Sequence, residues 1–131
     1  VKTMITIENL DAERLHQLFL TLRADDRREL ELTQPHFDAE QLAHDHMRLC
    51  YAGFIACYDH RPVAVLSAVE LWPGLAQIGL LASDEWPRVA FAVARIAKRR
   101  EAQFFMAGFH RLQAIAWSQH HAGQNWLRRM G

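Results

Sequence analysis

Three short apolar segments follow one another between residues 53 and 83, and they constrain the fold more than any other part of the chain. Gly53–Asp59, Val63–Trp72 and Leu75–Ser83 each have the length and apolar character of a strand. They are separated only by His60-Arg61, after which Pro62 opens the second strand, and by Pro73-Gly74, and both pairs are typical of tight turns. Such short connections predict an antiparallel meander. The central segment is apolar on both faces, so we expect both faces to be covered.

The residues before this meander have the periodicities of one more strand and of helices. Met4–Leu10 alternates apolar and polar residues, as a half-buried strand does. Residues 11–22 and 38–50 carry apolar residues at helical spacing, and each run opens on an aspartate that suits an N-cap. Between them, residues 23–35 are polar and charged, which is typical of a loop or of a weak helix.

A helix, a strand and a last helix are predicted after the meander. Pro87 suits the first turn of a helix, and Gly108 is a natural stop for it. Residues 111–117 have the pattern of a strand, and Ser118 opens a final helix that reaches residue 130. The predicted order is β-α-α-β-β-β-α-β-α. It indicates an α/β (α+β) fold with a mixed, mostly antiparallel sheet flanked by helices, in a single domain over residues 1–131.

Composition limits the number of domains, the kinds of partner and the cellular compartment that we expect for this chain. Half of its 131 residues are hydrophobic, which is enough for one domain with a substantial core. Its net charge is zero with histidine neutral, so we expect neither nucleic acid nor a membrane surface as a partner. No apolar run approaches the roughly 18 residues of a membrane span, and no signal peptide is visible. Cys50 and Cys57 form no disulfide framework, which favours a reducing compartment, and we expect Cys57 to be buried.

The junction between the last meander strand and the basic helix is the main candidate for a ligand site. Ile78–Ala82 leads within a few residues into that helix, and a helix N-terminus can hold a phosphate. In one interpretation, the N–H groups of residues 86–90, the helix macrodipole and Arg88 hold an anion. In the other, Ser83 or Asp84 caps an ordinary helix start, because the turn has no glycine and its two acids would repel a phosphate.

The element order and the last residues of the chain resemble the GNAT acyltransferase superfamily. The segment "AGFHRLQAIAWSQHHAGQNWLRRMG" is similar to the closing part of that fold. Arg111–Trp117 matches its fifth strand, Ser118–Met130 the helix that follows, and Gly131 the glycine of its closing pair. More narrowly, Gly53–Gly131 resembles the small GNAT-like proteins of tailed bacteriophages, including a branch of internal virion proteins, in its Ser-Asp pair, its tryptophan and its basic helix.

This resemblance implies an acetyl-CoA-dependent N-acyltransferase that transfers an acyl group directly from the thioester to a small-molecule or protein amine. Glu70, late in its strand, would be the base, and its plainer interpretation is a solvated strand-end residue. His120 falls where relatives have an asparagine that contacts the cofactor, and with His121 it is a second base candidate or an exposed capping pair. Coenzyme A would lie along Leu80, Leu81, Ala82, Trp86, Pro87, Arg88, Val89 and Ala90.

Of three departures from the pattern, the missing glycines and Leu127 favour an alternative function. The glycines that let backbone N–H groups approach the pyrophosphate in relatives are missing from residues 84–90. Leu127 stands where active relatives often carry a tyrosine as general acid, and the family's final hairpin is absent after Gly131. The alternative is a catalytically degenerate GNAT-fold phage protein that serves as a virion component or binds a host protein. Its location would be the cytoplasm of the infected cell or the virion.

Two further expectations concern metals and self-association. His44 and His46 are two residues apart and do not share a helix face, so we expect no metal site. Without a final hairpin, the strand Leu112–Trp117 would present an unpaired edge, which predicts a homodimer anchored by Trp117 and Trp126. Alternatively, the last helix covers that edge within one chain.

Overall fold

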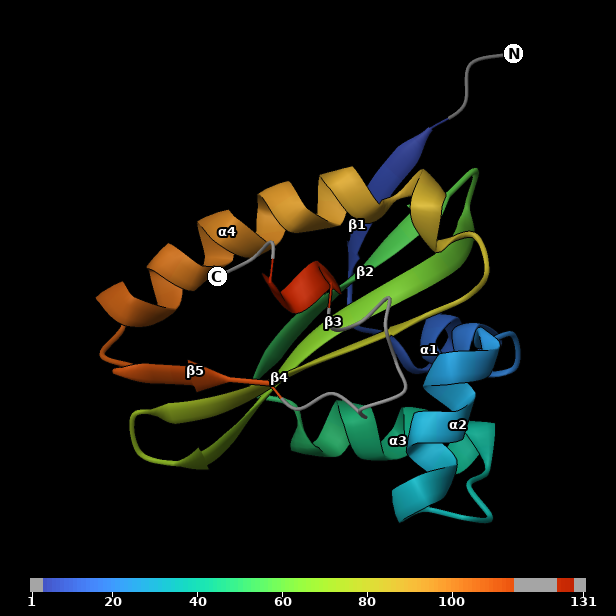
Figure 1. Ribbon diagram of the computed structural model, residues 1–131, viewed down its shortest axis with the longest axis horizontal. Helices are drawn as coiled ribbons and strands as arrows, with labels where there is room; N and C mark the ends of the chain where they lie inside the picture. The colour runs from blue at the N-terminus through green and yellow to red at the C-terminus, as the bar shows by residue number, and fades with distance from the viewer. Residues whose placement is uncertain (1–3, 115–124, 129–131) are drawn as a thin grey trace.

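The computed structural model describes residues 4–114 and 125–128, and these residues form one five-stranded sheet with helices on both faces (Figure 1). The strands lie in the order β1-β2-β3-β4-β5. All neighbouring pairs are antiparallel except β4 and β5, which are parallel. The strands are β1 (Ile5–Asn9), β2 (Ala52–Tyr58), β3 (Arg61–Trp72), β4 (Leu75–Ala82) and β5 (Arg111–Gln113), and the helices are α1 (Ala12–Phe19), α2 (Ala24–Thr33), α3 (Ala39–Leu49), the short 3₁₀ helix η1 (Trp86–Arg88) and α4 (Ala90–Met106).

The predicted meander is confirmed, with one small shift at its first turn. β2, β3 and β4 are joined by two tight turns. The first turn lies at Asp59 and His60, which both have positive φ values, of 47° and 69°. It therefore begins one residue earlier than predicted, because two consecutive left-handed residues give the twist that a hairpin needs. At the second turn Gly74 has a φ of +89°, which favours glycine there.

The sequence order missed one helix between β1 and β2. Residues 24–33, expected as a loop or a weak helix, form α2, so three helices separate these strands. The polar sequence of α2 gave no clear helical pattern, because the helix has no wide apolar stripe. Among its residues only Asp26 is buried. The two aspartate caps are confirmed. Asp11 accepts hydrogen bonds from the N–H groups of Glu13 and Arg14, and Asp38 accepts one from Glu40.

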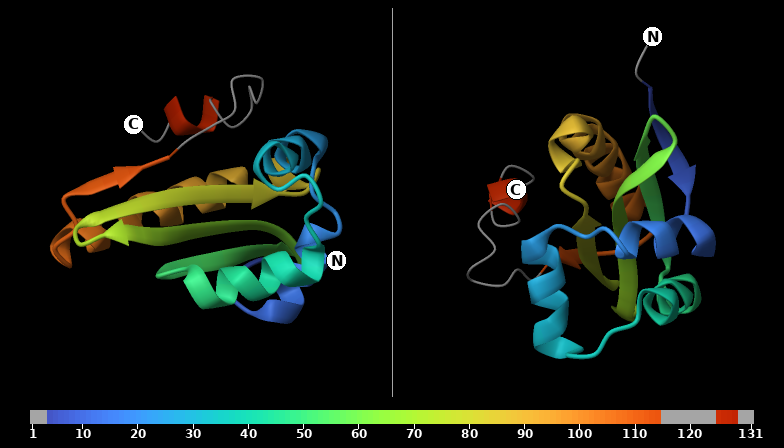
Figure 2. Two further views of the ribbon diagram at one scale, coloured as in Figure 1. Left: turned by 90° about the horizontal axis from the view of Figure 1, so that it is seen from below. Right: turned by 90° about the vertical axis from the view of Figure 1, so that its right-hand side faces the viewer.

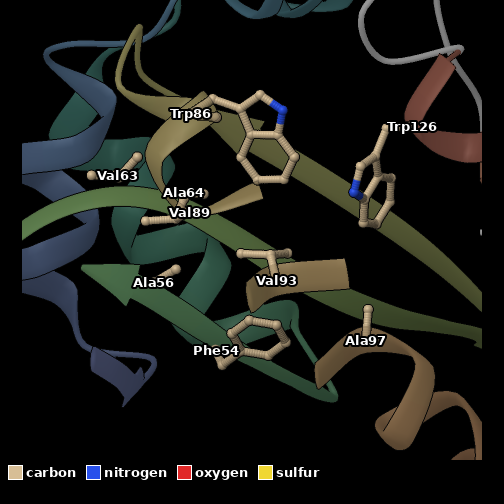
Figure 3. Packing of buried hydrophobic residues seen from close by; sticks show 10 residues of the cluster. Phe54, Ala56, Val63, Ala64, Trp86, Val89, Val93, Ala97 and Trp126 are labelled. Carbon is tan, nitrogen blue, oxygen red and sulfur yellow. The ribbon is translucent and has the colours of Figure 1, made fainter. Parts of the chain in front are cut away.

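The sheet separates two hydrophobic layers, as the apolar central strand predicted. On one face α4 packs on the sheet through Val93 and Ala97, which meet Phe54 and Ala64 (Figure 3). On the other face α1 and α3 cover the sheet, and Leu15 of α1 is fully buried there. Burying a side chain of that size stabilises the fold by about 1.5–3 kcal/mol. Both faces of β3 are therefore covered, which holds β3 and β4 rigidly beside the open edge of the sheet.

Of the elements predicted after the meander, the described residues include the first helix, the start of the strand and part of the last helix. α4 ends at Met106, and Gly108 follows with a φ of +106°, as expected of a stop signal. β5 is shorter than the predicted strand at residues 111–117, whose last three residues lie outside the described part of the chain, as do Ser118 and Gly131. Residues 125–128 form a helical turn on the β4–β5 side of the sheet (Figure 2).

Cys50 and Cys57 are both free thiols, and Cys57 is 1% exposed, which confirms that it is a small buried residue. Burial raises the pKa of each thiol above its ordinary value. Neither cysteine therefore has the lowered pKa of a reactive nucleophile.

Candidate functional site

The strands β4 and β5 pair over only three residues and then part. Their register runs from Leu75 opposite Arg111 to Gln77 opposite Gln113, and Ala114 is no longer in the strand. Two cavities, of about 300 Å³ and about 390 Å³, meet at this gap. Four residues line both cavities: Ile78, Ala114, Trp126 and Leu127. The gap therefore opens toward both faces of the sheet.

The two cavities differ in chemistry. The first lies on the α4 face and is mostly apolar, with Leu66 and Phe104 in its walls and Arg100 and Glu101 at its side. The second lies on the face of α1–α3 and is bordered by polar groups from six elements or connections. These polar residues are Arg23, Glu29, Gln34, His46, Ser67 and Gln77. The arrangement suits a ligand that has an apolar arm on one face and a polar reactant on the other.

The end of β4 is held by the segment between α1 and α2. The carboxylate of Asp26, 1% exposed, accepts a 2.7 Å hydrogen bond from the N–H of Ala82 and a 2.9 Å bond from Nε of Arg23. The N–H of Arg23 donates to the carbonyl of Ala82 at 2.9 Å. Both backbone groups of Ala82 that face away from β3 are therefore occupied.

Leu80 is the residue of the predicted cofactor-binding stretch of β4 whose backbone faces the gap. Backbone groups of successive strand residues point to alternate sides, so Leu80 faces the same side as Ala82, and Leu81 faces β3. Leu80 lies between the last β4–β5 pair, at Gln77, and the Asp26 contact at Ala82. Of the three β4 residues predicted to line the pantetheine, Leu80 is thus the one that can still pair with an extended ligand, while Leu81 contributes its side chain to the second cavity.

The acids in the turn after β4 are less repulsive than the sequence indicated, because one of them is neutralised. Glu85 receives two hydrogen bonds from Arg61, at 2.7 and 3.2 Å, and lies 3.9 Å from Arg88. The hydrogen bonds from Arg61 hold the pKa of Glu85 below its ordinary value. Arg88 also stacks on the ring of Tyr58, with 4.8 Å between the guanidinium carbon and the ring centroid. Ser83 caps the turn through a 3.3 Å bond from the N–H of Glu85.

The free N–H groups lie later in the chain than the sequence suggested. The N–H groups of Trp86, Arg88 and Val89 all donate to carbonyls within the turn, and Pro87 has none. α4 begins only at Ala90, and no side chain caps it. The first N–H groups of a helix have no partner within it. The amides at residues 90–92 are therefore the ones that can meet an anion at this junction.

Trp126 reaches from the helical turn 125–128 into the gap. Its ring lies edge-on to that of Trp86, with centroids 6.2 Å apart, and it packs near Val93 and Ala97 (Figure 3). The ring is 9% exposed, and its Nε1 is buried without a hydrogen-bond partner among the residues that the structure describes. Leu127, beside it, lines both cavities.

Of the two predicted bases, only Glu70 lies among the described residues, and it does not reach the cavities. Glu70 is exposed near the tip of the β3–β4 hairpin, opposite Ala76, and it lines neither cavity. Its neighbour Val69 lines the second cavity, and successive strand residues face opposite sides, so Glu70 points to the other face. His120 and His121 lie outside the described residues. The structure instead brings His46 to the second cavity, where the sequence considered it only as a metal ligand.

Comparisons with known proteins reveal the fold but no family assignment from sequence. No protein-family model matches the chain, and no curated protein matches it by sequence. Among solved structures, the ribosomal-protein-S18-alanine N-acetyltransferase from Escherichia coli has a TM-score of 0.69 at 11% identity, over 98% of this chain and 77% of that one. A GNAT-family acetyltransferase from Bacillus anthracis has a TM-score of 0.68 at 13% identity, over 100% and 81%.

A further structure of this kind contains the cofactor. The aminoglycoside N-acetyltransferase AAC(6')-Iy, in complex with CoA, has a TM-score of 0.57 at 13% identity, over 100% of this chain and 89% of that one. The protein described here therefore has the GNAT acetyltransferase fold, as its element order predicted. These likenesses support the superfamily fold in general and give no support to the narrower phage branch. Within the described residues, no helix has the length and apolar character needed to cross a membrane.

Proposed function

We propose that this protein is an acetyl-CoA-dependent N-acyltransferase that acetylates an amine. The observation that carries the proposal is the gap between β4 and β5, where the backbone of Leu80 has no strand partner among the described residues between Gln77 and the Asp26 contact at Ala82. A strand edge within a gap that opens to both faces suits an extended pantetheine arm, because such an arm can pair with a strand edge as another strand does.

The described residues fit coenzyme A along this edge. The N–H and carbonyl of Leu80 would pair with the amides of the pantetheine, whose thioester supplies the acyl group. The N–H groups at residues 90–92 and the positive end of the α4 macrodipole would hold the pyrophosphate. Arg88 would add positive charge beside them, and Arg61 offsets the opposing charge of Glu85. Ala90 belongs to the predicted set, while Trp86, Pro87 and Val89 would contribute only side chains.

The acceptor amine would enter from the polar second cavity. Neighbours of this fold are named as N-acetyltransferases of an aminoglycoside and of an alanine of ribosomal protein S18, and both acceptors carry an amine. The cavity, about 390 Å³ in volume, is large enough for a side chain or a small ring bearing an amine. Attack of the amine nitrogen on the thioester carbon would occur beside Leu80, because this residue borders the second cavity and the gap.

Leu127 favours slow catalysis. A leucine cannot reprotonate the leaving thiolate, and position 127 faces both cavities. This feature, together with the turn that lacks glycines, favours the second candidate, a catalytically degenerate protein of this fold that binds another protein. The phage origin, and a location in the host cytoplasm or the virion, stay predictions from the sequence pattern.

The test compares cofactor binding with turnover. Thermal unfolding is measured with and without millimolar acetyl-CoA, and release of the CoA thiol is followed with a panel of an aminoglycoside, a peptide with N-terminal alanine and a simple alkylamine. We expect stabilisation by acetyl-CoA and slow, amine-dependent thiol release. Stabilisation without release for any amine would favour the degenerate alternative, and no stabilisation would contradict both the cofactor and the activity.

We also propose that the protein forms a homodimer through the β5 edge. β5 is the last strand in the sheet order, and β-edges pair readily when they are left uncovered. Trp117, predicted as an anchor, lies outside the described residues, while Trp126 is buried against Trp86 within the chain. Light scattering at micromolar concentration tests this proposal, because a single species of one chain's mass would exclude the dimer.

A further inference from the structure

His46 is held in one orientation on α3, at the wall of the second cavity. Its ring lies 5.0 Å, centroid to centroid, from the ring of Phe19, at an interplanar angle of 55°. Its Nδ1 lies 3.1 Å from the carbonyl oxygen of Leu42, one helical turn earlier. The side chain is half-buried and lines the same cavity as Leu80 and Ser67. A ring fixed from two sides at a cavity wall is suited to act on whatever occupies that cavity.

The contact with Leu42 determines which nitrogen of His46 can accept a proton. A carbonyl oxygen only accepts hydrogen bonds, so the proton of the neutral ring lies on Nδ1. Nε2, the ring nitrogen farther from the main chain, then carries the lone pair. The backbone of α3 therefore sets the tautomer, as the carboxylate partner of a catalytic histidine does in other enzymes.

The charges around His46 come from three directions. Asp45 is next to it on α3, Arg23 and Glu29 border the cavity from the α1–α2 side, and the Cys50 thiol bonds to Ser67 of β3. Burial lowers the pKa of His46 below its ordinary value, against the opposing effects of the Leu42 carbonyl and Asp45. The ring is thus neutral at pH 7, which is the state that can take up a proton.

We propose that His46 is the general base that deprotonates the acceptor amine, directly or through one water molecule. The inference deepens the proposed N-acyltransferase function and rests on it. In this step the amine nitrogen attacks the thioester carbon, the C–N bond forms and the C–S bond breaks. The proton of the amine passes to Nε2 of His46, and the CoA thiolate leaves and is protonated from solvent.

The main competitor for this role within the cavity is Glu29 of α2, which lines the same wall. Glu70 lines neither cavity. The variants His46→Gln and Glu29→Gln therefore separate the two candidates. His44→Gln is the matched control, because His44 lies two residues away on the same helix and is exposed.

The first measurement is the pH dependence of kcat/KM for acetyl-CoA and the best acceptor of the amine panel. We expect His46→Gln to lower kcat/KM at pH 7 by about 10²- to 10⁴-fold, the usual contribution of a general base. In the wild type the rate rises with pH through the pKa of His46, and this rise should be lost in His46→Gln and kept in Glu29→Gln and His44→Gln. A His46→Gln variant with an unchanged profile would overturn the proposal.

The second measurement does not depend on turnover. NMR of ring nitrogens in the wild type should give His46 as the Nδ1–H tautomer, neutral at pH 7. A protonated ring at pH 7, or a proton on Nε2, would overturn the proposal. Stabilisation by acetyl-CoA should survive in His46→Gln, so a failure of this base alone is distinguishable. If acetyl-CoA does not stabilise the wild type, the proposed function fails and the role of His46 fails with it.

Discussion

The carboxylate of Asp26 and the backbone N–H of Ala82 are joined by a 2.7 Å hydrogen bond across 56 residues of sequence. The carboxylate also binds Arg23, and its bond to the N–H of Ala82 is buried. It fastens the start of α2 to the end of β4. It also limits the part of the β4 edge that a ligand can pair with, because the N–H of Ala82 already donates to Asp26.

Asp26→Ala is expected to destabilise the fold strongly. Removing one partner of a buried ion pair leaves Arg23, which is 11% exposed, and the Ala82 N–H without the charge that they bind. Such losses cost about 3–5 kcal/mol. The midpoint of urea unfolding measures the loss. Asp25→Ala, one residue away and exposed, should change stability by less than about 0.5 kcal/mol. Similar midpoints for both variants would show that the contact is not stabilising.

We expect the ring of Trp126, and not its N–H group, to contribute to the stability of the fold. Trp126→Phe keeps an aromatic ring against Trp86 and removes an Nε1 that has no hydrogen-bond partner among the described residues, so we expect a loss below about 1.5 kcal/mol. Trp126→Ala empties the gap and should cost about 3–5 kcal/mol. Both values come from denaturant unfolding. If the phenylalanine variant is as unstable as the alanine variant, the indole N–H has a partner that this account lacks.

Leu127→Tyr should increase acetyl transfer. Position 127 lines both cavities, so a hydroxyl there could protonate the leaving thiolate, an effect typically worth about 10²- to 10⁴-fold in rate. The assay is thiol release at saturating acetyl-CoA. Leu127→Phe is the control, because it has the same ring without the hydroxyl. Equal gains in both variants would mean that packing, and not proton donation, limits the wild-type rate.

Stability should fall as the pH falls below about 6.5, in part through His46. Burial holds the pKa of His46 in the folded protein below the ordinary value of 6.5. Between these two pKa values the unfolded chain binds a proton that the folded chain excludes, so acid favours unfolding. Unfolding free energies measured from pH 7.5 to 5 should decrease less steeply for His46→Gln than for the wild type. His44→Gln should follow the wild type, and an identical slope in all three would contradict the burial of His46.

The sequence could predict those parts of the fold that depend on local patterns. Apolar periodicity predicted the meander, and turn and cap residues predicted the helix caps at Asp11 and Asp38 and the helix end at Gly108. All of these predictions are confirmed. α2 was left open because its charged sequence has little apolar stripe, and one buried aspartate anchors it. Such a residue looks like any exposed aspartate in the sequence.

The candidate site was harder to predict, because long-range contacts assemble it. The sequence predicted the strand-to-helix junction after β4. It did not reveal that the N–H of Ala82 donates to Asp26, or that the N–H groups of Trp86 and Val89 donate to carbonyls within the turn. The sequence considered His46 only together with His44, as a metal-binding pair that it did not favour, and only the fold reveals that the His46 ring borders the cavity beside Leu80. Which backbone N–H groups are already hydrogen-bonded can be known only from the tertiary structure.

Acetyl-CoA binding along β4 tests the central claim most directly, through the thermal shift of two variants at Leu80. Leu80→Pro removes the N–H that faces the gap without removing a hydrogen bond to β3, while Leu80→Val keeps that N–H. At a ligand concentration 100-fold above Kd, binding stabilises by about 2.7 kcal/mol, which raises Tm by several degrees. Each protein is compared with its own ligand-free Tm. The account predicts a clear shift for the wild type and for Leu80→Val and a much smaller one for Leu80→Pro. Equal shifts in all three, or no shift in the wild type, would contradict it.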